Sequence, residues 1–333
     1  HMKTEFELIL LTIEHHLPIL EISLPYIRRF IKPSKITIIA SKSCLKKINN
    51  MGFVDEDVVL LDEDRVVEGI TLDYVRSLIE SRGGEVGRAG WYFKQLLNFA
   101  YAMRPETMDY YLTWDSDGIP VRPISFFDEK DRILLTKYSG YHNHKPYFYT
   151  IEALIGLKRE VDFSFIAEHM MFKREYMLSL LHLIARSENL EGKIFVKSVI
   201  TAIQSDHISG AGFAEYETYG TYVYKKFPKA VLVRDISYVR GGADLFGLSP
   251  SDADLFTLST KYSWASFESH KVSTARLIKC RLWGRIWRYA IMVKNYKAYI
   301  LFKKSNRLFM KANKSNSVTK INDSLLNLRT IKK

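Results

Sequence analysis

The sequence is poor in cysteine and has no long uninterrupted apolar run. Its two cysteines, Cys44 and Cys280, are far apart and belong to no Cys-x-x-Cys pair. Structural zinc sites and disulfide frameworks need several closely spaced cysteines, so neither is predicted. Near the N-terminus, Glu5, Glu7 and Glu14 interrupt the only apolar stretch. No signal peptide is therefore predicted, and we expect a cytoplasmic protein.

Acidic residues are almost missing from the last part of the chain. Residues 271–333 contain 17 Lys or Arg and one acid, Asp323, which gives a net charge of +16. The 270 residues before them carry 32 basic and 36 acidic residues, a net charge of −4. Because 47% of the chain is apolar and 26% is charged, a packed core is expected. We predict a globular domain over residues 3–270 and a basic tail over residues 271–333.

Apolar runs alternate with helical patterns at the start of the domain. Residues 7–12 (ELILLT), 35–41 (KITIIAS) and 57–64 (DVVLLDED) are typical of buried strands, and residues 18–30 carry apolar side chains at helical spacing. Strand, helix, strand, loop and strand in succession indicate a parallel sheet with crossover helices. We therefore predict an α/β, Rossmann-like fold with a mixed, mostly parallel sheet flanked by helices.

A glycine-containing segment leads into a predicted helix that begins near Trp91. Four apolar residues recur at positions i, i+3, i+4 and i+7 and predict the face that packs on the sheet: Phe93, Leu96, Leu97 and Ala100. Lys94 and Gln95 lie elsewhere on this helix. The next run, residues 110–114 (YYLTW), is predicted to be a strand that leads directly to Asp115.

Two acids, Asp115 and Asp117, follow that strand. Ligands of a parallel α/β sheet bind beyond the carboxyl ends of its strands, and side chains at i and i+2 of an extended segment point the same way. Both carboxylates can therefore face one divalent cation. Carboxylate oxygens with an incomplete protein shell suit Mg²⁺ or Mn²⁺ when phosphate oxygens complete the coordination. The alternative is a solvated turn in which Asp117 and Gly118 only bend the chain.

These residues resemble a known enzyme family. The segment TWDSDGIPVRP, which begins at Thr113, looks like the Asp-X-Asp motif of nucleotide-sugar-dependent glycosyltransferases with the GT-A fold. Three further segments, GWYFKQLLNFA, EHMMFKRE and GFAEYETYG, are similar to bacterial surface-polysaccharide members of that class. The resemblance extends over roughly residues 7–270 in element order. It implies a GT-A-like domain followed by a basic, amphipathic helical tail.

The resemblance also implies an activity. It is the metal-dependent transfer of a sugar from a nucleotide-diphosphate sugar, with a UDP-sugar as the expected donor. The implied acceptor is a lipid-linked polysaccharide or a lipopolysaccharide (O-antigen) precursor. Two other readings stay open: a non-catalytic nucleotide- or glycan-binding module of the same fold, and a basic protein associated with nucleic acid.

The metal candidates follow from the resemblance. Asp117 is the expected direct ligand of Mn²⁺ or Mg²⁺, and Asp115 contacts the ion through water or holds the ribose. The family often adds a late histidine as a ligand, for which His270 is the best-placed candidate and His207 the alternative. A lone histidine can equally be structural.

Two acids near a glycine-rich turn are the candidate catalytic residues, Glu215 and Glu217. An inverting transfer needs a general base, for which Glu215 is the first choice; in a retaining transfer it would bind substrate instead. The competing explanation is charge compensation at a helix start.

Five further residues are candidates for binding the donor: Thr12, Glu14, Lys94, Gln95 and His169. Thr12 and Glu14 follow the first strand, where GT-A proteins place the nucleotide base. Lys94 and Gln95 precede the Asp-X-Asp strand and would reach the donor sugar or phosphate. His169 would hydrogen-bond a sugar hydroxyl. Ordinary surface or core positions are the alternative for each.

The tail combines aromatic, aliphatic and basic residues. Helical spacing places five side chains in one stripe: Trp283, Ile286, Trp287, Ala290 and Val293. Arg281, Arg285 and Arg288 form another stripe. This pattern is typical of a helix lying on an anionic membrane, and its uncharged runs are far too short to cross one. We expect a protein peripheral to the inner face of a bacterial plasma membrane, unless the helices pack on the domain. Nucleic-acid binding is not expected, because the tryptophans share a face with aliphatic residues and the domain is acidic.

Overall fold

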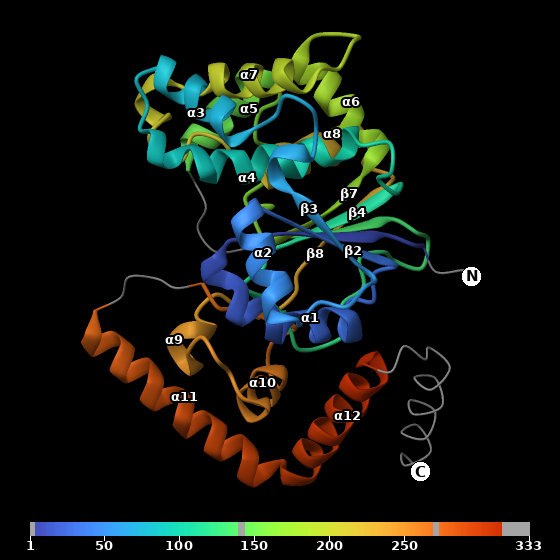
Figure 1. Cartoon of the computed structure of the whole chain (residues 1–333), viewed down its shortest axis with the longest axis vertical. Helices are drawn as coiled ribbons and strands as arrows, with labels where there is room; N and C mark the ends of the chain where they lie inside the picture. Colours follow the sequence, from blue (N-terminus) through green and yellow to red (C-terminus); the bar gives the residue numbers. More distant parts are fainter. Residues whose placement is uncertain (1–3, 139–143, 269–272, 315–333) are drawn as a thin grey trace.

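In the computed structural model, residues 4–138, 144–268 and 273–314 are described. Their centre is a five-stranded sheet (Figure 1). Its strands, in spatial order, are β3 (Val58–Asp62), β2 (Lys35–Ala40), β1 (Glu7–Leu11), β4 (Tyr110–Trp114) and β7 (His169–Lys173). β1, β2, β3 and β4 are parallel, and β7 is antiparallel to β4. The predicted α/β class with a mixed, mostly parallel sheet is confirmed.

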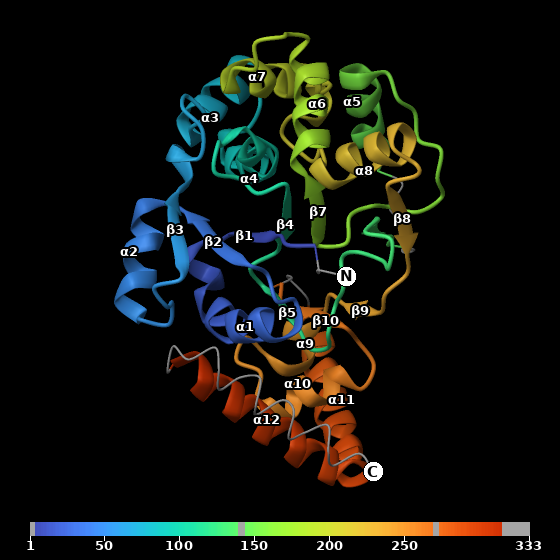
Figure 2. The same ribbon diagram turned by 90° about the vertical axis from the view of Figure 1, so that its right-hand side faces the viewer.

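Helices cover both faces of this sheet (Figures 1 and 2). On one face lie α1 (Leu17–Phe30) and α2 (Lys42–Met51). The other face carries α3 (Leu72–Ser81), α4 (Ala89–Ala100), α5 (Lys145–Ile155), α6 (Arg174–Ala185), α7 (Gly192–Ala202) and α8 (Glu215–Lys226). Because both faces are covered, the strands are mostly apolar, and every residue of β1 is buried, including the charged Glu7.

The helix predicted near Trp91 is α4, and its buried face is the predicted one. Phe93, Leu96, Leu97 and Ala100 are all almost fully buried in the main core. Tyr111 of the neighbouring strand β4 donates a hydrogen bond of 3.0 Å to the Asn98 carbonyl oxygen at the end of the helix. This contact fixes α4 against the strand that leads to Asp115.

Two small sheets complete the domain. β5 (Gly118–Pro120) pairs antiparallel with β10 (Trp264–Ser266), which pairs parallel with β9 (Tyr238–Val239). β6 (Ile133–Thr136) pairs parallel with β8 (Val231–Arg234). The first of these sheets brings residues near 240 and 266 next to the segment that follows β4.

The tail forms two helices, α11 (Thr274–Lys294) and α12 (Tyr296–Lys314), that cross the bottom of the molecule in Figure 1. They pack on α9 (Gly242–Phe246) and α10 (Asp252–Ser259). Arg288 forms an ion pair of 2.9 Å with the buried Asp254, and Asn306 donates a hydrogen bond of 2.5 Å to the Tyr26 hydroxyl oxygen. A second apolar cluster joins α1, α9 and α10, and Trp287 packs against it. The tail therefore contacts the domain, while much of its surface stays exposed.

Candidate active site

The order of the sheet marks one edge as the place for a ligand. The chain moves outward from β1 to β2 and β3 and then returns to place β4 on the other side of β1. Thr12 follows the carboxyl end of β1 and Asp115 that of β4. In open α/β sheets ligands bind at such a switch point, because the connections on its two sides diverge and leave a crevice.

A cavity of about 310 Å³ lies at this edge, beyond the end of β4. Its residues come from segments that are far apart in the sequence. The charged side chains that line it are His16, Lys94, Asp115, Asp117, Glu168, Glu215, Arg240 and Glu268. Five of them are acids and two are permanent cations, so the cavity wall is an acidic surface.

Asp115 and Asp117 occupy a tight turn between β4 and β5, where an extended segment was predicted. The Gly118 amide donates to the Asp115 carbonyl oxygen (2.9 Å), and the Phe267 amide donates to the Asp117 carbonyl oxygen (2.9 Å). Both side chains nevertheless line the cavity. Asp117 is buried, whereas Asp115 keeps partial access to solvent.

One face of α4 supplies a cation and an aromatic side chain to the site. Trp91, Lys94 and Gln95 all line the cavity from positions i, i+3 and i+4. The Lys94 Nζ donates a hydrogen bond of 3.0 Å to Asp115 Oδ1. Burial alone would lower the pKa of Lys94, but the charge and hydrogen bond of Asp115 outweigh it and hold that pKa above its ordinary value. Lys94 is therefore a cation held beside the acidic turn.

Three carboxyl groups in the cavity hold protons more tightly than free carboxyls do. Burial and the charge of Asp115 raise the pKa of Asp117 to about 6. Burial raises the pKa of Glu215 to about 7, with Lys94 opposing the shift. Burial and the charge of Asp115 raise the pKa of Glu168 to about 8, with Arg240 opposing it. A cation arriving at this surface would relieve the repulsion among these groups.

A second, mostly apolar hollow of about 380 Å³ adjoins the first. The two share the lining residues His16, Trp91 and Lys94. Thr12 and Glu63 are the polar residues at its far side. A flat, largely apolar group could enter this hollow while a charged group attached to it lies in the acidic cavity.

His16 stands between the two hollows in a neutral state. Its Nδ1 lies 2.9 Å from the Ser116 Oγ in the acidic turn. Burial and the nearby charge of Lys94 lower the pKa of His16 to about 4. An uncharged imidazole can accept or donate one hydrogen bond at this junction.

The two predicted catalytic acids have different surroundings. Glu215 begins α8 and lines the cavity; its Oε1 accepts from Asn98 Nδ2 (3.1 Å), and its amide donates to Gln95 Oε1 (3.1 Å). Glu217 does not line the cavity. Its Oε1 accepts hydrogen bonds from the Ser164 hydroxyl and from the Phe165 amide. These two bonds tie the Glu217 carboxylate to the loop that precedes β7.

Three predicted donor-binding residues lie in different places. Thr12 lines the apolar hollow. Glu14 is on the exposed turn Glu14–His16 and forms an ion pair with Lys47. His169 is fully enclosed: its ring stacks on Trp114 (5.2 Å between centroids), and its Nε2 lies 3.0 Å from the Thr136 Oγ1. Neither Glu14 nor His169 lines either hollow.

Of the two histidines considered as metal ligands, the structure describes only His207. His270 lies outside the residues that the structure describes. His207 is in the turn Ser205–His207 and lines neither hollow. Within the described ranges, no three His, Cys, Asp or Glu side chains are grouped so as to hold an ion by themselves.

The acidic turn still fits a divalent cation that arrives with a phosphate group. Asp115 and Asp117 supply hard oxygen donors, which Mg²⁺ and Mn²⁺ prefer. The raised pKa of Asp117 is caused by burial and by the charge of Asp115, so a cation there would be stabilised by both carboxylates. An ion with two protein carboxylates needs further oxygens, which a diphosphate provides.

Arg240 and Glu268 line the cavity and were not among the predicted site residues; in the segment that begins at Glu168, the cavity is lined by Glu168 and not by His169. Arg240 Nε donates to Glu168 Oε1 (2.8 Å), and its Nη2 lies 3.4 Å from Glu268 Oε2. The available signal was the run Arg240-Gly241-Gly242, in which Gly242 packs so closely on Ser266 that a Cβ there would lie 2.7 Å from the Ser266 carbonyl oxygen.

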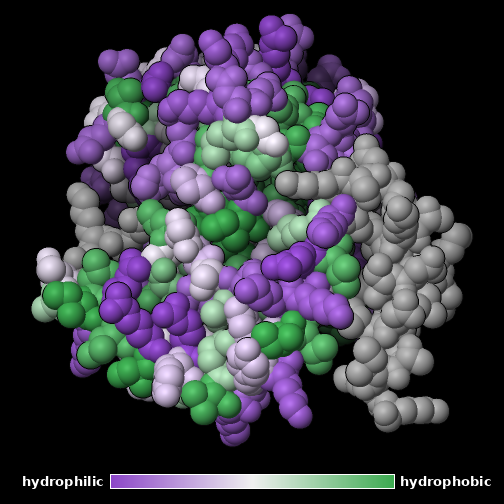
Figure 3. All heavy atoms as spheres, turned by 60° about the horizontal axis from the view of Figure 1, so that its bottom comes forward, coloured by the Kyte–Doolittle hydropathy of each residue, from purple (hydrophilic) through white to green (hydrophobic). Residues whose placement is uncertain are grey.

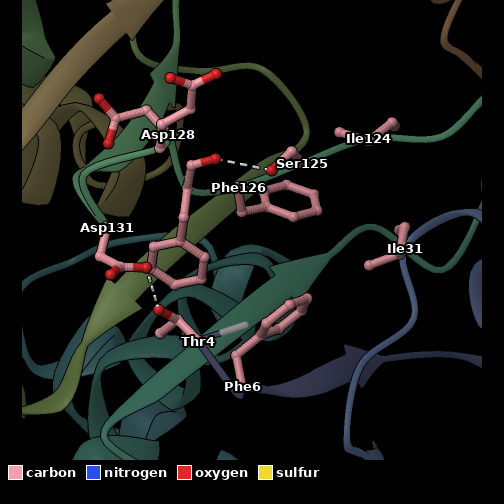
Figure 4. A pocket seen from close by; sticks show the side chains of 10 residues that line it. Thr4, Phe6, Ile31, Ile124, Ser125, Phe126, Asp128 and Asp131 are labelled. Atoms are coloured by element: carbon pink, nitrogen blue, oxygen red, sulfur yellow. Dashed lines mark hydrogen bonds between the residues drawn. The ribbon is translucent and has the colours of Figure 1, made fainter. Parts of the chain in front are cut away.

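Another hollow lies away from this chemistry, beside the amino end of β1. It has a volume of about 590 Å³, and Figure 4 shows Phe6, Phe126 and Ile124 around it with Asp128 and Asp131 at its rim. Ligands of parallel sheets bind at the opposite, carboxyl end. We therefore place the functional site at the acidic turn.

No protein-family model and no curated protein sequence matches the chain. Solved structures do match it. Mouse xyloside xylosyltransferase 1, in its apo form, is 14% identical with a TM-score of 0.42 over 79% of this chain and 97% of that chain. The galactosyltransferase LgtC, in complex with donor and acceptor sugar analogs, is 10% identical with a TM-score of 0.42 over 82% of this chain and 94% of that chain.

The bifunctional glycosyltransferase WbbM, in its apo structure, is 10% identical with a TM-score of 0.41; the match covers 80% of this chain and 46% of that chain. These are distant similarities. The three proteins are glycosyltransferases.

Proposed function

We propose that the chain is a glycosyltransferase that uses a divalent cation and a nucleotide-diphosphate sugar. The observation that supports this most directly is the position of Asp115 and Asp117. They lie at the switch point of the sheet, in an acidic cavity that adjoins a mostly apolar hollow. A nucleoside in the apolar hollow would place its diphosphate beside Lys94 and the acidic turn. The sugar would then occupy the rest of the acidic cavity.

The residues of the chain would act on the donor in distinct ways. Asp115 and Asp117 would hold the Mn²⁺ or Mg²⁺ ion, which when bound supplies Lewis-acid stabilisation of the leaving diphosphate. Lys94 would bind a phosphate oxygen once the cation takes over the pairing with Asp115. Trp91 and Thr12 would contact the nucleoside, for which we propose a UDP-sugar as donor. His16 would hydrogen-bond at the junction of nucleoside and diphosphate.

Glu215 would be the general base if the transfer inverts the anomeric centre. It lines the cavity, and its pKa of about 7 suits removal of a proton from an acceptor hydroxyl near neutral pH. In a retaining transfer the same carboxylate would stabilise the positive charge that develops on the sugar. Glu217 is engaged with Ser164 and Phe165, so its role would be to hold the loop that precedes β7.

Hydrolysis of the donor tests this proposal without knowledge of the acceptor. Purified protein is incubated with UDP-glucose, UDP-galactose or UDP-N-acetylglucosamine and Mn²⁺, and released UDP is measured. We expect slow hydrolysis of at least one donor, lost with a chelator and lowered at least about 100-fold by Asp117→Asn. Glu14→Gln, at an exposed position outside both hollows, is the matched control. Failure of UDP to bind in the presence of Mn²⁺ would refute the proposal.

We further propose that the tail holds the enzyme on an anionic membrane, where a lipid-linked polysaccharide or lipopolysaccharide precursor would be the acceptor. Within residues 273–314 there are 12 Lys or Arg and no acid. Large apolar side chains are exposed along α11 and α12: Ile278, Leu282, Trp283, Ile286, Tyr289, Val293, Tyr296, Ile300, Leu301 and Leu308. The face brought forward in Figure 3 mixes hydrophobic and hydrophilic side chains. Among the helices that the structure describes, none is long and apolar enough to cross a bilayer.

This surface combines the two forces that hold an interfacial helix on a membrane. Trp283 is 61% exposed and Tyr289 is 73% exposed, whereas Trp287 on the same helix packs toward Phe246 and Tyr262. The predicted stripe is thus divided: one tryptophan contacts the domain and the other points outward. Exposed aromatic side chains would enter the headgroup region while the basic residues attract anionic lipids.

Vesicle sedimentation tests the membrane proposal on the full chain. We expect retention on vesicles that contain 30% phosphatidylserine and little retention on phosphatidylcholine alone. Ile286→Glu should release the protein, because it places a charge in the exposed stripe. Leu183→Glu, on α6, is the control, since Leu183 has a similar environment of partial exposure on a helix far from the tail. Equal loss with both variants would count against a membrane-binding tail.

A further inference from the structure

Glu168 has a backbone conformation that its neighbours do not explain. Its φ is +62°, in the left-handed region that non-glycine residues usually avoid. Three other described non-glycine residues have positive φ: Lys32 and Arg186 lie just past helix ends, where this conformation is common, and Asp131 lies in a turn whose amides bond to Asp128. Glu168 instead directly precedes strand β7. Its carbonyl oxygen accepts the Asp115 amide at 3.1 Å, which joins it to the acidic turn.

The side chain of Glu168 is buried and held at both oxygens. It is 5% exposed and lines the cavity. Arg240 Nε donates to its Oε1 (2.8 Å), and Trp264 Nε1 donates to its Oε2 (3.4 Å). Each oxygen has a second lone pair, so at least one of them can still accept a hydrogen bond from the cavity whether the carboxyl is ionised or protonated. The carboxylate is therefore fixed in direction and open to a ligand.

Arg240 keeps this carboxylate in place from the cavity side. Its guanidinium also lies 3.4 Å from Glu268, and it is partly exposed in the cavity wall. A second cation next to this guanidinium would be repelled, which disfavours a metal ion at Glu168. A neutral ligand with hydrogen-bond donors has no such penalty. Sugar hydroxyls are donors of that kind.

We infer that Glu168 is a specificity-determining residue that accepts hydrogen bonds from hydroxyls of the transferred sugar, with Arg240 as its positioning residue. This inference rests on the proposed function, because it needs a sugar attached to a diphosphate at Asp115. The bond between the Glu168 carbonyl and the Asp115 amide places Glu168 next to that diphosphate. The left-handed backbone at Glu168 directs its side chain into the cavity. The next residue, His169, instead packs its ring against Trp114 and Trp264 in the aromatic core.

A buried acid elsewhere in the chain serves as a matched control. Asp254 is also buried and also pairs with an arginine, Arg288, at 2.9 Å. It lies on α10, against the tail, and lines neither hollow. Asp254→Asn therefore removes a buried, arginine-paired carboxylate charge without touching the cavity.

The test compares nucleotide binding with sugar recognition in the full chain. UDP binding with Mn²⁺ is measured by calorimetry, and hydrolysis is measured with UDP-glucose and UDP-galactose. For Glu168→Gln we expect UDP affinity within about threefold of the wild type. We expect kcat/KM for the better donor to fall about 10- to 100-fold, and the ratio of the two donors to move toward one. Asp254→Asn should leave that ratio unchanged.

A double variant separates positioning from general stability. Arg240→Gln alone should lower kcat/KM, and adding it to Glu168→Gln should cause little further loss, because the two residues act as a unit. If Glu168→Gln binds UDP normally and keeps both the rate and the donor ratio, the inference is wrong while the proposed function stands. If the wild type neither binds UDP nor hydrolyses any of the donors, the proposed function itself fails.

Discussion

Glu215→Gln should make the protein more stable, and the gain should depend on pH. The Glu215 carboxyl has an ordinary pKa of 4.5 and a folded-state pKa of about 7, because the folded chain buries it. Between these two values the folded state keeps a proton that the unfolded state releases, so stability falls as pH rises. Above pH 7 the full cost of ionising the buried carboxyl is present. Glutamine has the same shape and no such cost.

The size of the effect follows from the two pKa values. Their separation corresponds to roughly 3 kcal/mol of unfolding free energy at pH 8.5, and to less than about 1 kcal/mol at pH 5. The glutamine can still accept the Asn98 hydrogen bond at its carbonyl oxygen, so little else changes. We therefore expect Glu215→Gln to gain about 3 kcal/mol at pH 8.5 and to lose donor turnover.

Urea denaturation, monitored by tryptophan fluorescence with a chelator present, measures the unfolding free energy at pH 5 and at pH 8.5. Glu14→Gln is the control: Lys47 lowers the pKa of the exposed Glu14, so this variant should show no gain at pH 8.5. A Glu215→Gln gain that is equal at the two pH values, or a loss at pH 8.5, would refute the account of Glu215 as a buried, destabilising carboxyl.

Three further predictions follow from single contacts. Lys94→Met should weaken UDP binding about tenfold in calorimetry with Mn²⁺, because it removes the cation beside the acidic turn; unchanged affinity would contradict its phosphate-binding role. Glu217→Leu should destabilise the protein by about 2 kcal/mol in urea denaturation, because Ser164 and the Phe165 amide lose their acceptor, whereas Glu217→Gln should keep donor hydrolysis near the wild-type rate. Gly284→Leu should cost about 1–3 kcal/mol and expose α11 to trypsin, since an added Cβ would lie 2.6 Å from the Leu245 carbonyl oxygen; unchanged proteolysis would argue against this close helix contact.

The central sheet and its helices were predictable because their apolar periodicity is strong. β1 is buried along its whole length, and α4 repeats its apolar residues over two turns, so both patterns are visible in the sequence. The small sheets were missed in part because β5, β9 and β10 are two or three residues long. A segment of two or three residues is too short to show an alternation of apolar and polar side chains. Its place in a sheet depends on which distant segment it pairs with.

The site residues that directly follow a predicted strand could be located from the sequence, whereas those placed by turns or short strand pairings could not. Asp115 and Asp117 come directly after β4, so their place at the sheet edge follows from the fold. The choice between Glu168 and His169 depends on a single left-handed residue, which no side-chain pattern announces. Arg240 reaches the cavity only because β9 pairs with β10, a contact that the sequence does not reveal.

The wide spacing of the site along the chain also bears on how the protein folds. β1 reaches β4 across about a hundred residues, with Glu7 paired to Tyr111, and the last wall of the cavity is supplied by Glu268. Such non-local pairing forms late and slowly. If the acids approach one another only as these distant segments close, their mutual repulsion opposes that closure. Refolding should consequently be faster at pH 5 than at pH 8, and a divalent cation should speed it most at the higher pH.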